Sequence, residues 1–186
     1  MRRLIFFFYF IILSLIFYDT SFSSELDFIK DGKKILLIRH ALAPGGGDPD
    51  NFDLKECETQ RNLSKEGVEQ SKKIGEFLKE NKIPIKKVLS SQWCRCKDTA
   101  QYAFNYYEEF SALNSTFQSR FASNEPKQLA EIKRFVKKWD NNEGNLVMVT
   151  HYSIITALTN ATPASGEIVI TDKKFNVLGK ILINFD

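Results

Sequence analysis

Hydrophobic residues along the chain follow two patterns that predict different secondary structures. Short and nearly continuous apolar runs are typical of strands that are covered on both faces of a sheet. Apolar residues that recur every three or four positions predict amphipathic helices. The predicted strands cover residues 34–39, 87–90, 145–150, 167–171 and 177–184. The predicted helices cover residues 64–81, 94–107, 126–139 and 154–159.

The order of these elements predicts the fold class. Strands that alternate with helices form a mainly parallel sheet with helices on both faces, so we expect a three-layer α/β domain. The last two strands, joined by a turn at residues 172–176, are expected to add an antiparallel pair at the edge of the sheet. Residues 41–59, which are rich in Gly, Pro and Asp, are expected to form a long loop. Loops of this length are usually functional or mobile.

The N-terminus carries the most biased segment of the chain. Two arginines precede residues 4–18, which carry no charge and are mostly Phe, Ile and Leu. This run is shorter than the ~20 residues that a membrane-spanning helix needs, and small residues follow at Ser23 and Ser24. These features predict a signal peptide over residues 1–24, cleaved near one of the two serines, and a single domain over residues 25–186.

An alternative for the same segment is an uncleaved membrane anchor, because Tyr18, Phe22 and Phe28 could extend the apolar stretch. Both interpretations predict export, so the protein is expected to be periplasmic or secreted. If the segment is cleaved, no stable membrane insertion of the remaining chain is expected.

Composition and charge are those of an ordinary globular protein. The 186 residues suit one domain, and 43% of them are hydrophobic while 26% are charged. The net charge is +3, and the basic residues are interspersed with acidic ones rather than gathered into a stripe. This balance gives no reason to expect nucleic acid as a partner.

Three cysteines, Cys57, Cys94 and Cys96, would lie in a compartment that tolerates a disulfide. Their odd number leaves one unpaired. A bridge from Cys57 to Cys94 or to Cys96 is plausible and would tie the long loop to the segment that carries Arg95, whereas a bridge between Cys94 and Cys96 would be strained. A zinc site is the weaker interpretation, because the chain has only two histidines and both have another expected role.

Basic side chains follow three of the predicted strands. Arg39 and His40 close the first strand, Arg95 comes shortly after the second, and His151 directly follows the strand at residues 145–150. The carboxyl ends of parallel strands meet at one edge of a sheet, where ligands bind. Each histidine alone could be no more than a hydrogen-bonded residue at a strand end. Together with the arginines, the two histidines favour a shared site.

These residue types suit phosphoryl transfer. An imidazole is largely neutral near pH 7, so one of its nitrogens can attack phosphorus without a separate base. Arginine supplies permanently charged donors that bind phosphate oxygens and stabilise charge in the transition state. A second imidazole, if protonated, adds another donor. Cations already line such a site, so we expect neither a metal nor another cofactor.

Several motifs resemble the histidine phosphatase superfamily. The motifs are LIRHA at residues 37–41, SSQWCRCKDTA at 90–100, VTHYSIITALT at 149–159, RNLSKEG at 61–67 and ASGEIVI at 164–170. The resemblance implies a phosphoglycerate mutase-like fold. It also implies that His40 is the phosphorylated nucleophile and that Arg39, Arg95 and His151 bind the transferred phosphoryl group. The GGGDPDNF loop with the WCRC segment resembles an exported bacterial branch similar to the lipopolysaccharide-core heptose phosphatase.

The sequence departs from the family pattern in two places. Ala41 stands where the common motif has Gly, which should matter little unless this residue needs a positive φ. No motif identifies the acid that would protonate the leaving oxygen. Asp48, Glu109 and Glu125 are the candidates, although each could be only a solvated surface acid. Some phosphohistidine phosphatases of the superfamily lack an evident acid.

The residues around the expected site have less specific signals. Gly45, Gly46 and Gly47 could present backbone amides to a phosphate, although a flexible turn is the simpler interpretation. Arg61 could reach the substrate, but a lone exposed arginine usually does not. Trp93 could stack on a sugar ring, but core packing is its default role.

The sequence therefore predicts an exported phosphomonoesterase that acts on a phosphorylated small molecule or glycan through a phosphohistidine intermediate on His40. A phosphohistidine phosphatase and a mutase are alternatives within the same superfamily. A phosphate-binding module without turnover is an alternative of a different class.

Overall fold

The computed structural model describes residues 20–140 and 142–183, so residues 1–19 of the predicted signal peptide lie outside it. The described residues form a six-stranded sheet in the order β3-β2-β4-β1-β5-β6. The strands are β1 (Ile35–Arg39), β2 (Ile85–Ser90), β3 (Glu108–Glu109), β4 (Asn145–Thr150), β5 (Ile168–Thr171) and β6 (Val177–Ile181). The helices are α2 (Thr20–Lys30), α3 (Lys65–Glu80), α4 (Cys94–Phe104), α5 (Ser119–Ala122), α6 (Glu125–Lys138) and α7 (Tyr152–Thr159). Short 3-10 turns are η1 (Cys57–Thr59) and η2 (Ser111–Leu113).

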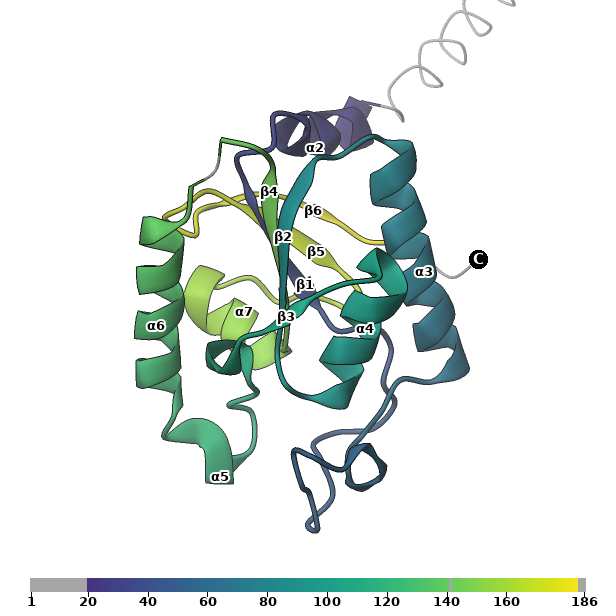
Figure 1. Cartoon of the computed structure of the whole chain (residues 1–186), viewed down its shortest axis with the longest axis vertical. Helices are drawn as coiled ribbons and strands as arrows, with labels where there is room; N and C mark the ends of the chain where they lie inside the picture. Colours follow the sequence, from purple (N-terminus) through teal and green to yellow (C-terminus); the bar gives the residue numbers. More distant parts are fainter. Residues whose placement is uncertain (1–19, 141, 184–186) are drawn as a thin grey trace, which may run out of the picture.

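The predicted fold class is confirmed. Helices α3 and α4 cover one face of the sheet, and α6 and α7 cover the other (Figure 1). Strands β3, β2, β4 and β1 run parallel, while β5 is antiparallel to β1 and β6 is antiparallel to β5. The predicted antiparallel pair at the end of the chain is therefore present as well. The result is a three-layer α/β domain with a mixed, mostly parallel sheet.

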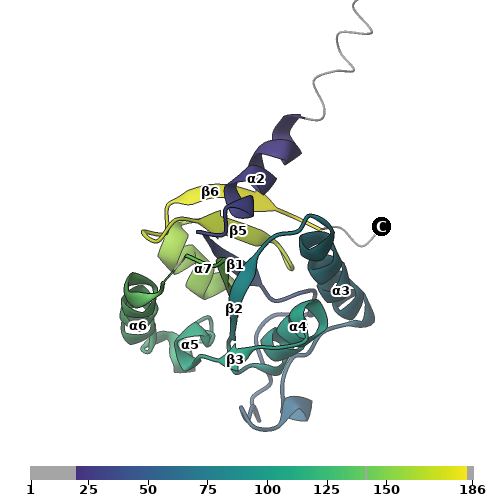
Figure 2. The same cartoon turned by 45° about the horizontal axis from the view of Figure 1, so that its top comes forward.

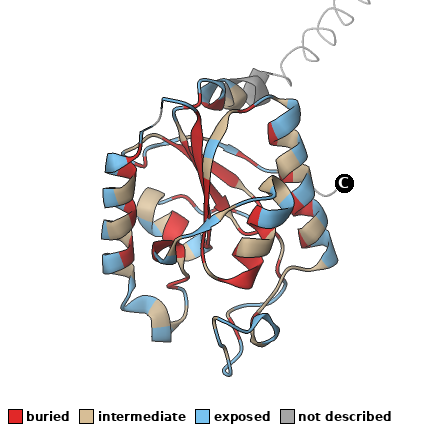
Figure 3. Ribbon diagram, viewed as in Figure 1, coloured by how far each residue is buried: buried red, intermediate tan, exposed pale blue. Residues whose placement is uncertain are grey.

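The central strand β1 shows why the core has two halves. Side chains alternate between the two faces of a strand, so Leu36 and Ile38 pack with α3 and α4 while Ile35 and Leu37 pack with α6 and α7. All four side chains are fully buried. Burial of one such side chain stabilises the fold by roughly 1.5–3 kcal/mol. Figure 3 shows the buried strands between helices whose outer faces are exposed.

Helix α2 was not predicted from the sequence. It lies over the β5–β6 side of the sheet (Figure 2), and the side chain of Ile29 is fully buried. Asn145 Nδ2 donates to the Ile29 carbonyl at 2.7 Å, which ties the end of α2 to β4. The cleavage predicted near Ser23 or Ser24 would fall inside α2 and leave Ile29 in the core. Within the described residues, every helix is too short or too polar to cross a membrane.

Strand β3 and helix α5 were not predicted either, and the predicted elements lie close to their expected positions, with shifted ends. Helix α4 stops at Phe104 rather than at residue 107, because Asn105 adopts a left-handed conformation with φ of 62° and caps the helix. Strand β2 begins at Ile85, two residues before its predicted start. Strand β6 ends at Ile181, whereas the sequence predicted a strand to residue 184.

Candidate active site

The pairing of β1 with β4 brings the two histidines together. Arg39 pairs with Thr150 in the parallel register, so the residues that follow them, His40 and His151, leave neighbouring strands at the same edge. The His40 backbone N–H donates to the Thr150 carbonyl at 2.9 Å. The two imidazole rings have centroids 5.5 Å apart. The strand ends thus place both histidines of the chain in one site.

Arg95 reaches this site from the next strand. Strand β2 pairs with the other side of β4, and α4 starts four residues after β2 ends. Arg95, the second residue of α4, is buried, and its Nη2 lies 3.4 Å from His151 Nδ1.

A disulfide between Cys57 and Cys94 fastens the long loop to the start of α4. Of the two bridges that the sequence left open, the structure contains the one to Cys94. Cys96 is a buried free thiol with its Sγ 3.4 Å from His151 Nε2. Burial raises the pKa of this thiol to about 12, so Cys96 remains protonated at neutral pH.

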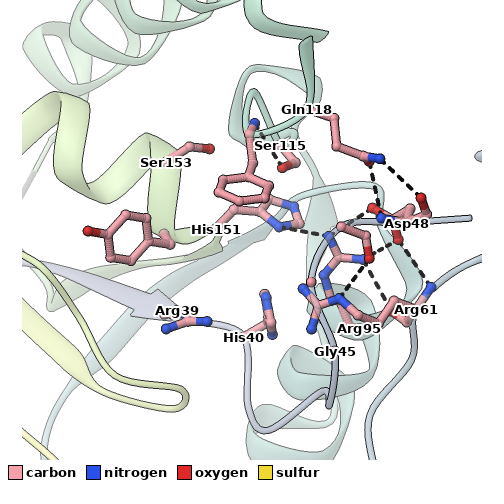
Figure 4. A pocket seen from close by; sticks show the side chains of 14 residues that line it. Arg39, His40, Gly45, Asp48, Arg61, Arg95, Ser115, Gln118, His151 and Ser153 are labelled. Atoms are coloured by element: carbon pink, nitrogen blue, oxygen red, sulfur yellow. Dashed lines mark hydrogen bonds and ion pairs between the residues drawn. The ribbon is translucent and has the colours of Figure 1, made fainter. Parts of the chain in front are cut away.

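The site is a cavity of about 310 Å³ at the carboxyl end of the sheet, seen from close by in Figure 4. Its lining residues are Arg39, His40, Gly45, Gly46, Gly47, Asp48, Arg61, Arg95, Ser115, Phe117, Gln118, His151, Tyr152 and Ser153. The charged members are three arginines and one aspartate, which leaves two net positive charges when the histidines are neutral. The cavity therefore suits an anion with more than one negative charge.

His40 is held in the state that a nucleophile requires. Its Nδ1 lies 2.8 Å from the carbonyl oxygen of Ala41. A carbonyl only accepts, so Nδ1 carries the proton of the neutral ring and Nε2 keeps its lone pair. Burial, and then the charge of Arg95, lower the pKa of His40 well below its ordinary value. The ring is thus neutral at physiological pH.

His151 has the opposite tautomer. The guanidinium of Arg95 can only donate, so His151 Nδ1 accepts, and its Nε2–H donates to Ser91 Oγ at 2.8 Å. Ser91 Oγ in turn donates to Asn114 Oδ1 at 3.2 Å. Burial, and then the charge of Arg95, lower the pKa of His151 well below its ordinary value. This chain of hydrogen bonds fixes the ring.

Two arginine donors at the cavity lack a partner. The Nε atoms of Arg39 and Arg95 are buried, and neither has a hydrogen-bond partner among the described residues. The remainder of the Arg39 guanidinium is positioned by the carbonyl of Pro163, which accepts from Nη1 at 3.0 Å, and by the Tyr152 ring, whose centroid lies 5.6 Å from Cζ. Buried donors are normally paired, so the two Nε–H groups are suited to an anionic ligand.

Asp48 lies in the cavity but is bound to Arg95. Its two carboxylate oxygens accept from Arg95 Nη1 at 2.7 Å and from Nη2 at 3.2 Å. The indole Nε1 of Trp93 and the backbone N–H of Arg61 also donate to this carboxylate, at 3.0 Å and 3.1 Å. Burial alone would raise the pKa of Asp48, but the hydrogen bonds and the charge of Arg95 outweigh it and lower the pKa. Asp48 is therefore an anion that orients Arg95.

The other two candidate acids lie outside the cavity. Glu125 begins α6, and its Oε2 accepts from Thr116 Oγ1 at 3.0 Å. Glu109 is exposed in β3, where its Oε2 accepts from Gln92 Nε2 at 3.2 Å. Neither residue lines the cavity.

Arg61 lines the cavity, which the sequence did not predict. Its Nε donates to the Gly47 carbonyl at 3.0 Å, and its Nη1 donates to the Ala43 carbonyl. Burial, and then the charge of Arg95, lower the pKa of Arg61 to about 10, so it remains charged at neutral pH. The only sequence signal for it was its place in the RNLSKEG motif.

The glycine-rich loop is fixed to the rest of the cavity by Gln118. Its Nε2 donates to the Asp48 carbonyl at 3.0 Å, and its Oε1 accepts from the Asp48 backbone N–H at 3.1 Å. Ala41, the departure from the family motif, does not have a positive φ, and its N–H donates to Thr99 Oγ1. The backbone there does not require glycine.

Comparisons with known proteins agree with this arrangement. The family model of the histidine phosphatase superfamily (branch 1) matches residues 35–114, which include Arg39, His40 and Arg95 but not His151. No curated protein sequence gives a significant match.

Solved structures match over most of the chain. TTHB049 from Thermus thermophilus has a TM-score of 0.57 at 15% identity, over 81% of this chain and 99% of its own. A phosphoglycerate mutase from the same organism has a TM-score of 0.54 at 15% identity, over the same shares. The protein histidine phosphatase SixA, solved with tungstate, has a TM-score of 0.52 at 15% identity, over 80% of this chain and 96% of its own.

The fold is therefore phosphoglycerate mutase-like. Over residues 35–114, the chain is similar to the histidine phosphatase superfamily, branch 1, a family of catalytic phosphatases.

The ion pair between Asp48 and Arg95 is expected to stabilise the fold. Asp48→Asn removes the anion and leaves Arg95 buried without its partner, so we expect the free energy of unfolding to fall by about 3–5 kcal/mol. The pKa of Asp48 is lowered, so its stabilisation is fully present above its ordinary pKa of 3.8 and is lost as the pH falls through the lowered value. Urea unfolding of both proteins between pH 2 and pH 7 measures this difference.

Glu125→Gln is the matched control, because Glu125 is also a hydrogen-bonded acid but has no buried cation beside it. This variant is expected to change stability by less than about 1 kcal/mol. If Asp48→Asn proved as stable as the control at pH 7, Asp48 would not be the partner that holds Arg95.

Proposed function

We propose that this protein is an exported phosphomonoesterase that transfers a phosphoryl group to Nε2 of His40 and then to water. The observation that supports the proposal most strongly is the state of His40, whose Nδ1 is occupied by the Ala41 carbonyl while Nε2 keeps its lone pair. The ring is neutral inside a cavity whose lining carries net positive charge. A neutral nucleophile surrounded by cations is suited to attack a phosphate dianion.

The proposed first step forms one bond and breaks one. The lone pair of His40 Nε2 forms a bond to phosphorus while the bond from phosphorus to the ester oxygen breaks. The leaving oxygen departs with the electron pair and takes a proton from water. Arg39 and Arg95 bind the equatorial phosphoryl oxygens, which carry the charge in the transition state.

The second step restores the enzyme. A water oxygen attacks phosphorus, the bond to Nε2 breaks, and its electron pair returns to His40. The water releases one proton, which balances the proton taken up by the leaving group. His151, held by Ser91 and in contact with Arg95, is proposed to help position the phosphoryl group. Arg39 and Arg95 stabilise the charge of the phosphoryl oxygens in both steps.

The leaving group is proposed to depart without a carboxylic acid from this chain. Asp48, the only carboxylate among the residues that line the cavity, has a lowered pKa because it is bound to Arg95. Glu125 and Glu109 do not line the cavity. This arrangement supports hydrolysis of substrates whose leaving oxygen is only weakly basic, or whose leaving group is protonated by solvent.

The proposed substrate class is a phosphorylated small molecule or glycan. The GGGDPDNF loop and the WCRC segment, which resemble an exported branch similar to the lipopolysaccharide-core heptose phosphatase, support a glycan phosphate. Among the described residues that line the cavity, the carboxylate of Asp48 is bound to Arg95, which supports a second candidate, a phosphohistidine phosphatase, because a phosphoramidate needs less help to leave.

A phosphoenzyme experiment tests the proposal. The protein is mixed with p-nitrophenyl phosphate in the presence of a chelator, quenched with alkali, and examined for covalently bound phosphate. We expect a burst of p-nitrophenol and a phosphoprotein that is stable in base and labile in acid, as phosphohistidine is. Steady hydrolysis without any covalent phosphate would contradict the proposal, and so would a complete lack of hydrolysis.

Export is tested separately. The N-terminal sequence of the mature protein made in its host is expected to begin near Ser23 or Ser24. Retention of Met1 on protein outside the cytoplasm would favour the membrane anchor instead, and protein that remained in the cytoplasm would contradict export.

A further inference from the structure

The cavity has an aromatic side chain at its mouth that nothing in the described part of the chain covers. Phe117 lines the cavity and is 65% exposed, which is the largest exposure of any large hydrophobic side chain in the described residues. Tyr152 lines the same cavity and is 37% exposed. Exposed aromatic surface is unfavourable in water, so two such side chains at one mouth suggest a ligand that covers them.

The exposure of Phe117 is imposed by the hydrogen bonds of its neighbours. The backbone N–H of Thr116 donates to Ser153 Oγ at 3.2 Å, and its hydroxyl donates to Glu125 Oε2 at 3.0 Å. On the other side, Gln118 is bound to the backbone of Asp48. The segment is therefore fixed on both sides of Phe117, and the phenyl ring is held at the mouth in a preorganised position.

The Tyr152 ring is also held in place. The guanidinium of Arg39 lies against it, with Cζ 5.6 Å from the ring centroid. The glycine-rich loop also lines the cavity, and open space surrounds the position that a side chain would take at Gly46. The mouth of the cavity thus combines the aromatic side chains of Phe117 and Tyr152 with a glycine-rich loop that leaves room for a bulky group.

Both aromatic residues line the cavity, and Phe117 belongs to the segment that includes Ser115. Figure 4 shows Arg39 and His40 on one side of the cavity and Ser115 and Ser153 on the opposite side. Phe117 is two residues beyond Ser115, whereas the Tyr152 ring lies beside Arg39, whose Cζ is 5.6 Å from the ring centroid. In phosphoryl transfer the attacking and leaving atoms are roughly in line, so a group displaced by His40 departs away from it.

We propose that Phe117 and Tyr152 bind a ring in the leaving group and make the enzyme selective for phosphate esters of ring-bearing alcohols or phenols. This inference rests on the proposed phosphatase function. The shared chemistry is an apolar ring face that packs on aromatic side chains, and its source is either an aryl ring or the C–H face of a sugar ring. The reaction itself is unchanged, with His40 Nε2 bonding to phosphorus as the oxygen attached to the ring leaves.

The test compares three substrates with wild type and Phe117→Ala. Phenyl phosphate represents aryl esters, glucose 1-phosphate represents sugar esters, and glycerol 1-phosphate is the acyclic control. For each substrate the ratio of kcat/KM between wild type and variant cancels the intrinsic reactivity of the ester. We expect a loss of roughly tenfold for at least one ring-bearing ester, and a change of less than about twofold for glycerol 1-phosphate.

Further variants separate ring binding from a general effect on folding. Phe117→Tyr keeps the aromatic face and should keep the selectivity. Tyr106→Ala removes an aromatic side chain that is 50% exposed and does not line the cavity. This variant should have the same kcat/KM as wild type for all three substrates. Tyr152→Ala is expected to lower kcat/KM for all three substrates, because Tyr152 also positions Arg39, and to lower it further for the ring-bearing esters that depend on Phe117.

The pattern of losses across the three substrates shows which kind of ring the site binds. A loss confined to phenyl phosphate assigns the site to aryl esters, and a loss confined to glucose 1-phosphate assigns it to sugar esters. Equal losses for all three substrates, or no loss for any, would overturn the inference. In both of those cases a phosphoenzyme on His40 would still support the proposed function, whereas the lack of any phosphoenzyme would reject the function itself.

Discussion

Replacing His40 by alanine is expected to lower kcat/KM for p-nitrophenyl phosphate by roughly 10,000-fold or more and to abolish the phosphoenzyme. The Nε2 lone pair of His40 is the nucleophile of the proposed mechanism, and removal of a nucleophile eliminates the covalent route. Its loss should lower kcat far more than it changes KM, because the arginines that bind the phosphate remain. Stopped-flow and steady-state assays measure both constants.

His151→Asn is the matched comparison, because His151 is also buried in the cavity but has no role as nucleophile in the proposed mechanism. This variant should react more slowly and still form the phosphoenzyme. Circular dichroism and thermal unfolding of both variants establish that they are folded. If His40→Ala kept activity within tenfold of wild type while folded, another group would have to be the nucleophile.

The second large effect is expected at Arg95. Arg95→Ala should lower kcat/KM by roughly 1,000-fold or more, because an arginine that stabilises phosphoryl transfer typically contributes 10³–10⁵. Arg95→Lys should recover only a small part of the loss. A lysine keeps the charge, but it cannot reproduce the two parallel hydrogen bonds to Asp48 or offer a planar fork to phosphate.

Arg134→Ala is the control for Arg95, because Arg134 is exposed on α6 and does not line the cavity. Its removal should leave activity unchanged. Because Arg95→Ala also leaves Asp48 buried without its partner, the double variant Arg95→Ala with Asp48→Asn should regain stability but not activity. Activity restored in the double variant would mean that Arg95 matters only for folding.

The meeting of the two histidines was predictable because it depends on local patterns. Apolar runs identify buried strands, and parallel strands place the residues that follow them at one edge of the sheet. These two facts are enough to predict that His40 and His151 lie close together. The placement of Arg95 near them is predicted because only a short segment separates β2 from α4. The register of Arg39 with Thr150 then brings the rings to a centroid separation of 5.5 Å.

The role of Asp48 was not predictable, because it depends on a contact with a residue 47 positions away. The sequence shows an acid in a glycine-rich loop, and only the fold shows that both of its oxygens accept from Arg95. The position of Arg61 in the cavity also depends on contacts between distant residues, because its side chain donates to the carbonyls of Gly47 and Ala43. Long-range contacts of loops leave no periodic signal in the sequence.

Helix α2 and the aromatic mouth were missed for other reasons. The apolar residues of α2 merge in the sequence with the run at residues 4–18, so the helix had no separate pattern, although Ile29 is fully buried. Phe117 was overlooked because the usual assumption places a phenylalanine in the core. Its exposure results from the hydrogen bonds of Thr116 and Gln118, which cannot be seen without the fold.

The identity of the phosphorylated nitrogen tests the proposed role of His40 most directly. The phosphoenzyme can be trapped in alkali, mapped by mass spectrometry, and assigned to one ring nitrogen by ³¹P and ¹⁵N NMR. Because Nδ1 of His40 donates to the Ala41 carbonyl, we expect phosphate on Nε2 of His40 and on no other atom. Phosphate on Nδ1 of His40, on His151 or on a hydroxyl group would contradict it.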